Sequence, residues 1–162
     1  MLSPEDFFPL YAELSLGLAG FAGIVSAFAG RDRQFRPTEL ARVISVVAAS
    51  SCVLVGCFAI FSVLAWGANV STSYQVAGAA CLAVSAAYFF SAFPRAWRSS
   101  KDPDSTSESW ALLVTAGAYL AIMLIYAGAV LTTMGFFCLI MGFSVHLLHG
   151  LWMFVRVLTR AN

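Results

Sequence analysis

Long apolar runs separated by short polar connections dominate this chain. Five runs are long enough to cross a lipid bilayer, for which a helix needs roughly 20 apolar residues. They are expected over residues 8–29, 43–66, 74–93, 110–131 and 134–158. The pattern therefore predicts an all-α integral membrane protein, in which five transmembrane helices form a single domain over residues 1–162.

The last two runs follow one another almost without interruption, from Trp110 to Val155. At ~1.5 Å per residue, one helix of this length would be far longer than a bilayer is thick, so the chain has to turn back. Thr132-Thr133-Met134-Gly135 is the natural place for the turn, because glycine permits a tight reversal of the backbone. The sequence therefore predicts a helical hairpin at this point.

The composition supports a membrane protein. The chain has 162 residues, 60% of them hydrophobic and 10% charged, with a mean hydropathy of +0.85. A soluble domain carries about 25% charged residues. We therefore expect the lipid bilayer to be the main surroundings of the chain. The basic residues form no concentrated face, so we predict no nucleic-acid partner.

The basic residues are confined to alternate connections. The connections 67–73 and 132–135 carry no charge. Basic loop residues stay on the cytoplasmic side of a membrane, so this distribution predicts an outer N-terminus and a cytoplasmic C-terminus. The expected location is the plasma membrane, as a multi-pass protein of a bacterial inner membrane. The nine basic residues are Arg31, Arg33, Arg36, Arg42, Arg95, Arg98, Lys101, Arg156 and Arg160.

A second topology also satisfies the charge rule. If the first run were a helix on the inner membrane surface, four spans with both termini inside would remain. A surface helix normally has a strongly polar face, and residues 14–30 carry no charge. The chain also begins with Glu5 and Asp6, unlike the positively charged start of a cleavable signal peptide. We therefore expect the first run to be retained as a span.

The first run carries a stripe of small residues that we call the glycine seam. Its members are three or four residues apart and so share one helix face. Small side chains allow close helix–helix contact in lipid, or they leave room for ions and water in a pore. The seam comprises Glu13, Leu16, Gly20, Gly23, Ala27 and Gly30. The candidates for a pore or ion-binding role are Glu13, Gly20, Gly23, Ala27 and Arg31.

Glu13 is the charged member of the glycine seam. It lies ~27 Å along a helix from Arg31, so it would be near the outer interface if Arg31 is at the inner one. A carboxylate is tolerated there without any further role. In a ring of subunits, however, repeated Glu13 side chains at an outer mouth would attract cations.

The last run carries a second stripe, the histidine stripe, which contains the only two histidines of the chain. A histidine in lipid is costly, so His146 and His149 should face protein or water. Three interpretations are open: hydrogen bonds to Ser, Thr or Tyr of neighbouring helices, proton relay or pH sensing, and metal ligation. The stripe comprises Gly142, His146, His149, Met153, Arg156 and Arg160.

Metal or cofactor binding is not predicted. His146 and His149 lack the glutamate of a zinc-protease motif, and no obvious third ligand lies on the same helix. The four cysteines lie inside apolar runs without CxxC spacing, which indicates small packing residues rather than a metal site or a disulfide framework. They are Cys52, Cys57, Cys81 and Cys138.

No catalytic motif is found, so we predict that the chain is not an enzyme. The chain is too small to enclose a pore alone. The leading hypothesis is therefore a homo-oligomeric membrane protein that conducts ions, with the first helix lining the pathway. The alternative is a non-catalytic structural, sensing or effector subunit that acts through an unidentified protein partner, with the glycine seam as a docking surface. An intramembrane enzyme built on the two histidines is the least supported reading.

Overall fold

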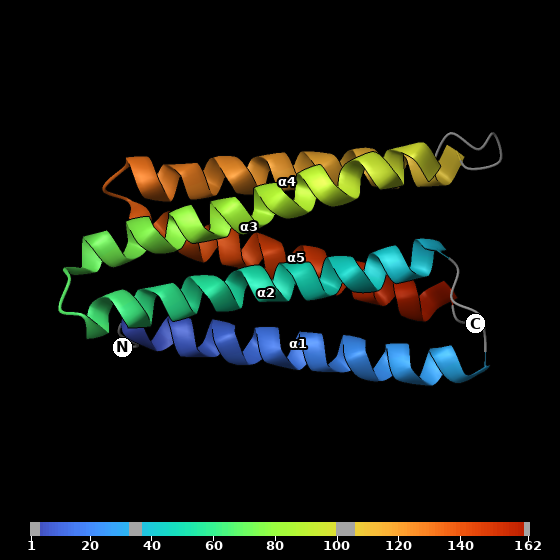
Figure 1. Cartoon of the computed structure of the whole chain (residues 1–162), viewed down its shortest axis with the longest axis horizontal. Helices are drawn as coiled ribbons and strands as arrows, with labels where there is room; N and C mark the ends of the chain where they lie inside the picture. Colours follow the sequence, from blue (N-terminus) through green and yellow to red (C-terminus); the bar gives the residue numbers. More distant parts are fainter. Residues whose placement is uncertain (1–3, 33–36, 100–105, 161–162) are drawn as a thin grey trace.

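The computed structural model describes residues 4–32, 37–99 and 106–160, and within them the chain is entirely helical apart from two short turns (Figure 1). Each helix is long and apolar enough to cross a membrane, so the predicted all-helical multi-pass architecture is confirmed at this level. The helices extend several residues beyond most of the predicted spans. They are α1 (Pro4–Asp32), α2 (Pro37–Ala65), α3 (Val70–Ser99), α4 (Thr106–Leu131) and α5 (Gly135–Arg160).

The two ends of the bundle differ in charge. The C-terminal ends of α1, α3 and α5 and the N-terminal ends of α2 and α4 lie together at one end, which we call the basic end (Figure 1). Arg31, Arg98 and Arg160 fall in the last turns of α1, α3 and α5, where a positive charge complements the helix dipole. The opposite end, the turn end, holds both short turns. Arg33, Arg36 and Lys101 lie outside the described residues.

The turn between α2 and α3 is fixed by its own hydrogen bonds. Gly67 has a φ of 80°, which favours glycine, and its N–H donates to the Leu64 carbonyl at 2.9 Å. The Ala68 N–H donates to the Val63 carbonyl at 3.3 Å, which completes a Schellman ending of α2. Asn69 then caps α3, because its side-chain oxygen accepts the Thr72 N–H at 2.8 Å. The sequence Gly-Ala-Asn thus reverses the chain in very few residues.

The turn between α4 and α5 is at the predicted place, but Gly135 has a different role from the expected one. Gly67, not Gly135, is the glycine with a positive φ among the described residues. Gly135 instead begins α5, and a Cβ atom added to it would lie 3.0 Å from the Cβ atom of Tyr74. The glycine is therefore needed for close contact between α5 and α3, and the reversal itself is made by residues 132–134.

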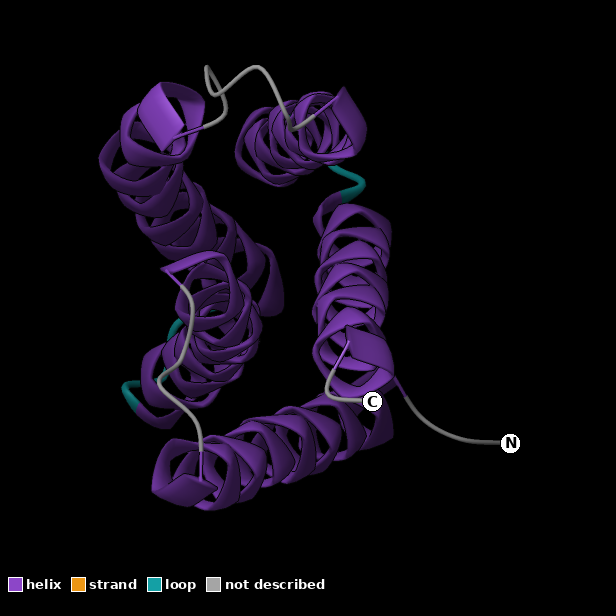
Figure 2. Ribbon diagram, turned by 90° about the vertical axis from the view of Figure 1, so that its right-hand side faces the viewer, coloured by secondary structure: helices purple, strands orange, loops and turns teal. Residues whose placement is uncertain are grey.

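The five helices pack into one bundle, in which α1 is attached mainly to α2. Seen along the bundle, the helices stand beside one another with their axes tilted (Figure 2). Helix α2 packs against α1, α3 and α5, and α4 packs against α3 and α5. The backbone of α1 lies close to α2 and α5, and its Phe8 ring also contacts Tyr74 of α3 at a centroid distance of 5.9 Å. The apolar span of α1 is the least buried of the five spans.

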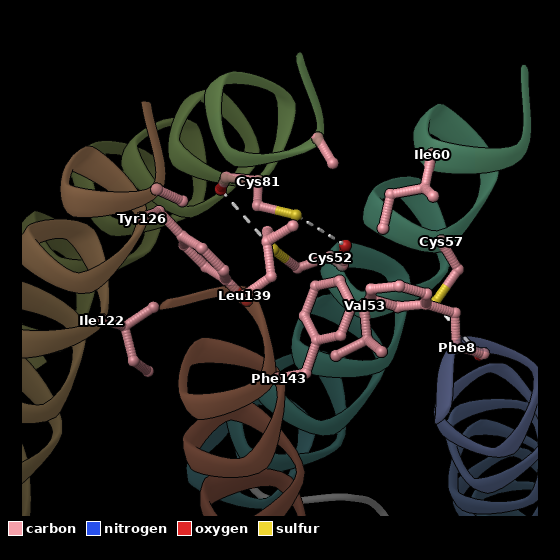
Figure 3. Close-up of a cluster of buried hydrophobic side chains, with 12 residues drawn as sticks. Phe8, Cys52, Val53, Cys57, Ile60, Cys81, Ile122, Tyr126, Leu139 and Phe143 are labelled. Carbon is pink, nitrogen blue, oxygen red and sulfur yellow. Dashed lines mark hydrogen bonds between the residues drawn. The ribbon is translucent and has the colours of Figure 1, made fainter. Parts of the chain in front are cut away.

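All five helices contribute to a continuous core cluster (Figure 3). The thiol of Cys52 donates to the Cys81 carbonyl at 3.5 Å, and the Cys81 thiol donates to the Cys52 carbonyl at 3.4 Å, which joins α2 to α3. The predicted packing role of the cysteines is confirmed: three are buried, and the half-buried Cys138 packs against the same cluster. The cluster comprises Phe8, Cys52, Val53, Cys57, Ile60, Ala77, Cys81, Ile122, Tyr126, Ala129, Leu139 and Phe143.

Candidate functional site

The glycine seam lies on the free surface of α1. Glu13, Leu16, Gly20, Gly23 and Ala27 are all exposed, and Leu16 retains 60% of its accessible surface. A Cβ atom added at Gly20 or Gly23 would meet no described atom within 4 Å. The seam therefore shares one face, but that face makes no close helix–helix contact within the described chain. The surroundings of Gly30 and the side chain of Arg31 lie outside what the structure describes.

The opposite face of α1 carries the residues that attach it to the bundle. Phe8 belongs to the core cluster, and Ser15 and Ala22 are buried. The hydroxyl groups of Tyr11 and Ser144 are hydrogen-bonded at 2.6 Å, which ties α1 to α5. A Cβ atom on Gly150 of α5 would lie 2.9 Å from a methyl group of Leu18. The face of α1 that packs inward therefore combines large residues such as Phe8 and Leu18 with small ones such as Ser15 and Ala22.

Glu13 places a carboxylate on the outward face within the apolar span Asp6–Val25. It lies ~13 Å along the helix from Pro4, the first residue of α1. A carboxylate facing hydrocarbon is costly, so Glu13 has to meet water, lipid headgroups or another protein surface. The remaining seam residues between Glu13 and the basic end are small or apolar.

The histidine stripe of α5 has the opposite orientation. Gly142, His146, His149 and Met153 are buried, with His146 only 1% and His149 only 6% exposed. Gly142 lies directly against the ring of Tyr126, leaving no space for a side chain. Two tyrosines of α4 face the two imidazoles. We call His146, His149, Tyr119 and Tyr126 the His–Tyr cluster.

The two histidines of the cluster differ in their hydrogen bonds. The hydroxyl of Tyr126 lies 2.9 Å from Nδ1 of His146, and the two rings stack at a centroid distance of 5.6 Å. Tyr119 lies edge-on to both imidazoles, 5.8 Å from His146 and 5.3 Å from His149. The Tyr119 hydroxyl and Nε2 of His149 have no hydrogen-bond partner among the described residues. One imidazole is therefore held by a direct bond, and the other is not.

Ring contacts continue from the His–Tyr cluster toward the basic end. His149 is 6.0 Å from the ring of Trp152, and the guanidinium of Arg156 lies 5.0 Å from the centre of that ring. This last distance is within the range of a cation–π interaction. Toward the turn end, the His–Tyr cluster is continuous with the core cluster, because Tyr126 is a member of both. The polar cluster thus approaches the surface on the basic side and ends against apolar packing on the other.

A side branch leads from the cluster into α3 and α2. The ring of Tyr88 lies 5.1 Å from that of Tyr119, and its hydroxyl is 2.5 Å from the Ser45 hydroxyl. Sequence reasoning selected the histidines and named tyrosine only as a type of partner. Tyr119 and Tyr126 lie seven residues apart on α4, and this spacing places them on one helix face. This seven-residue spacing is the feature of the sequence that could have identified the two tyrosines as partners of the histidines.

Two other features do not involve the candidate residues. A cavity of about 400 Å³ at the turn end is lined by the start of α3 and by the α4–α5 turn, including Ser71, Tyr74 and Thr133. Among the described residues, no group of three or more His, Cys, Asp or Glu side chains is arranged to hold a metal ion.

Comparison of the chain with protein-family models, with curated protein sequences and with solved structures gave no match. The functional conclusion is therefore drawn from the two stripes, one exposed on α1 and one buried on α5.

Proposed function

We propose that this chain is a subunit of a homo-oligomeric membrane protein that conducts ions, with the glycine seams of several copies lining the pathway. The single observation that carries the proposal is the outward orientation of the seam. Glu13, Gly20, Gly23 and Ala27 are exposed together on α1, and no described part of the same chain covers the two glycines.

The interior of a single bundle offers little room for a pathway. Tyr126 and Phe143 are fully buried in the core cluster, and the thiols of Cys52 and Cys81 bridge α2 and α3. Packed interiors of this kind contain few voids larger than a water molecule. An ion pathway would accordingly form between copies rather than within one copy.

A second copy is a suitable neighbour for the glycine seam. Helix association in lipid depends on close packing, which small residues permit, and not on the hydrophobic effect. Cyclic symmetry would turn the same face of every copy toward one axis. Glu13, a costly group in lipid, would then face a shared aqueous space instead.

The proposal also includes an orientation. The basic end would face the cytoplasm, as the confinement of basic residues to alternate connections indicates, and the turn end would face outward. Glu13 would then form a ring near the outer mouth and attract cations. Gly20, Gly23 and Ala27 would line the passage, and Arg31 would lie at its inner end. A bacterial inner membrane is the proposed location.

A second candidate function has its own supporting observation. Large apolar side chains flank the glycine seam, with Phe21 63% and Ile24 54% exposed. Such a mixed surface of small and large apolar residues is also suited to docking a different membrane protein. The chain would then be a non-catalytic structural, sensing or effector subunit, and Glu13 would have no role in ion movement.

Conductance measurements on the full chain reconstituted in lipid bilayers test the ion pathway. Glu13→Gln is expected to lower cation conductance or selectivity, because it removes the charge from the mouth. Glu13→Asp keeps the charge and is the matched control, for which we expect conductance close to that of the original chain. Absence of ion flux from well-folded oligomers would exclude the channel function.

Assembly is tested separately by leucine substitution of the glycine seam. Gly20→Leu or Gly23→Leu should convert the oligomer to monomers in detergent, as measured by light scattering. In the proposed ring the edges of the seam also touch the neighbouring copies, and a larger side chain would separate them. The control is Gly117→Leu on α4, a helix that does not contact α1 among the described residues. A Cβ atom at Gly117 also meets no described atom within 4 Å. Three results together would favour the docking function over the channel. Gly20→Leu would abolish the function of the chain, Glu13→Gln would leave it unchanged, and a different protein would co-purify with the chain.

A further inference from the structure

The two histidines of the His–Tyr cluster occupy different chemical situations, although they are only three residues apart. We propose that His149 is a proton-binding site inside the bundle, with a water molecule held between its Nε2 atom and the hydroxyl group of Tyr119. His146 is the fixed member of the pair, because its Nδ1 atom already faces the Tyr126 hydroxyl at 2.9 Å.

The site is built from two helices. Tyr119 comes from α4 and His149 from α5, their rings are 5.3 Å apart, and both side chains are more than nine-tenths buried. Neither the Tyr119 hydroxyl nor Nε2 of His149 has a hydrogen-bond partner among the described residues. Buried polar groups in proteins are nearly always hydrogen-bonded, either to protein or to ordered water. A water molecule can donate to one of these groups and accept from the other.

The groups around His149 come from every helix that packs against α5. Helix α4 contributes Tyr119, and α3 contributes Tyr88 behind it. Helix α1 meets this part of α5 with the apolar Leu18, next to Gly150. Helix α2 faces Gly150 with Ala49, and the next residue, Ser50, is buried with a hydroxyl group that has no hydrogen-bond partner among the described residues. Ser45 of α2 is hydrogen-bonded to Tyr88.

The charged groups on the helices around the site are toward the basic end or on the outer face of α1. Arg42 of α2 is half-buried and lies ~10 Å along that helix from Ala49, the residue that faces Gly150. On α5 itself, Arg156 is ~10 Å along the helix from His149, with the Trp152 ring between them. The acidic side chains that the structure describes, Asp6 and Glu13, are exposed on α1. The His–Tyr cluster therefore depends on hydroxyl groups and water, rather than on a carboxylate, to stabilise an added proton.

The proton step is a simple transfer. In the tautomer that carries hydrogen on Nδ1, the Nε2 atom of His149 has a free lone pair. A hydronium ion at the site gives its proton to that lone pair: one O–H bond breaks, one N–H bond forms, and a neutral water molecule remains beside Tyr119. The imidazole becomes an imidazolium ion. The reverse step releases the proton.

Access is from the basic end. Trp152 is 37% exposed and in ring contact with His149, so the site lies one side chain away from the surface there. On the other side, His146 and Tyr126 pack against the core cluster. The site thus exchanges protons with one side of the bundle. This inference does not depend on the use of the glycine seam, because the cluster lies on α4 and α5.

Nitrogen NMR of the imidazole rings tests the proposal directly. The full chain, labelled with ¹⁵N and placed in lipid nanodiscs, has only two histidines, so each gives a separate set of signals. We expect the His149 set to move from neutral to imidazolium positions as the pH is lowered from about 8 to about 3. The His146 set should still be neutral at the pH where the His149 set moves. His149→Asn identifies the moving set by deleting it. Two immobile sets, or movement of the His146 set alone, would overturn the proposal.

Substitution of Tyr119 tests the bound water. Tyr119→Phe should change the His149 signals at a fixed pH of about 8 and lower the thermal unfolding temperature, because the water loses one of its two partners. The matched control is Tyr88→Phe, which removes a hydroxyl bonded to Ser45 and should leave the His149 signals in place. A higher unfolding temperature for Tyr119→Phe would show that its hydroxyl is buried without any partner, and would overturn the site.

Discussion

Helices α1 and α5 carry stripes of the same spacing, yet the structure places them in opposite surroundings. The glycine seam of α1 faces outward, and the histidine stripe of α5 faces two tyrosines of α4. On α1 the other face attaches the helix to the bundle, with Phe8 in the core cluster. On α5 the stripe itself fills the interior. The spacing of residues therefore determines which of them share a helix face. Whether that face points inward or outward depends on the side chains of the rest of the helix.

The largest difference between the two stripes should appear when a methyl group is added to a glycine in each. Gly142→Ala on α5 would force a Cβ atom into the ring of Tyr126, which is fully buried. We expect a loss of about 2–3 kcal/mol in the free energy of unfolding, measured in detergent by thermal or SDS titration. Gly23→Ala in the glycine seam is the control, with no expected loss. Equal losses would show that the seam is also tightly packed within the chain.

A smaller effect is expected when the direct hydrogen bond of the cluster is removed. Tyr126→Phe keeps the ring but leaves Nδ1 of His146 without its partner at 2.9 Å. The expected loss is about 1–2 kcal/mol in the free energy of unfolding. A double-mutant cycle with His146→Phe provides the check, because two coupled residues should show non-additive losses. Additive losses would mean that the two side chains do not interact.

The tie between α1 and α5 is expected to contribute less. Ser144→Ala removes the hydroxyl that is 2.6 Å from the hydroxyl of Tyr11. Such bonds between membrane helices contribute about 0.6 kcal/mol on average, so a loss of that size is expected in the same unfolding titration. Ser91→Ala is a suitable control, since the Ser91 hydroxyl donates to the Tyr88 carbonyl of its own helix. A larger loss at Ser144 would mean that α1 is held to the bundle more firmly than its few contacts indicate.

A small effect of the opposite sign is expected at the glycine seam in a single copy. Gly20→Ala meets no described atom and replaces glycine by a better helix former. For the monomer in detergent we expect a gain of up to about 0.5–1 kcal/mol in unfolding free energy. A clear loss in the monomer would contradict the outward orientation of the seam.

The helical spans were predictable because hydrophobic run length depends on the bilayer and not on tertiary contacts. The run from Trp110 to Val155 could only be a hairpin, and the turn at residues 132–134 is where the sequence placed it. Some extensions beyond the spans, such as residues 106–109 of α4, were missed because polar helix ends have no apolar signal. The role of Gly135 was missed because its close neighbour, Tyr74, is distant in sequence.

The site was predictable only in part, for a similar reason. Spacing gave the members of each stripe, and the cost of a histidine in lipid indicated that His146 and His149 would face protein or water. The sequence could not show that Tyr119 and Tyr126 face the two histidines, because that contact depends on the packing of α4 against α5. Nor could it distinguish the hydrogen-bonded His146 from the unpartnered Nε2 atom of His149.

The two short turns bear on how such a chain enters a membrane. Residues 66–69 and 132–134 are uncharged and join α2 to α3 and α4 to α5. If insertion proceeds from the side of the basic end, each pair of helices can enter as a hairpin whose leading tip carries no charge across the hydrocarbon. Only α1, with Glu5, Asp6 and Glu13, would take charged side chains to the far side. That asymmetry makes α1 the span whose translocation should be most sensitive to added positive charge near the N-terminus.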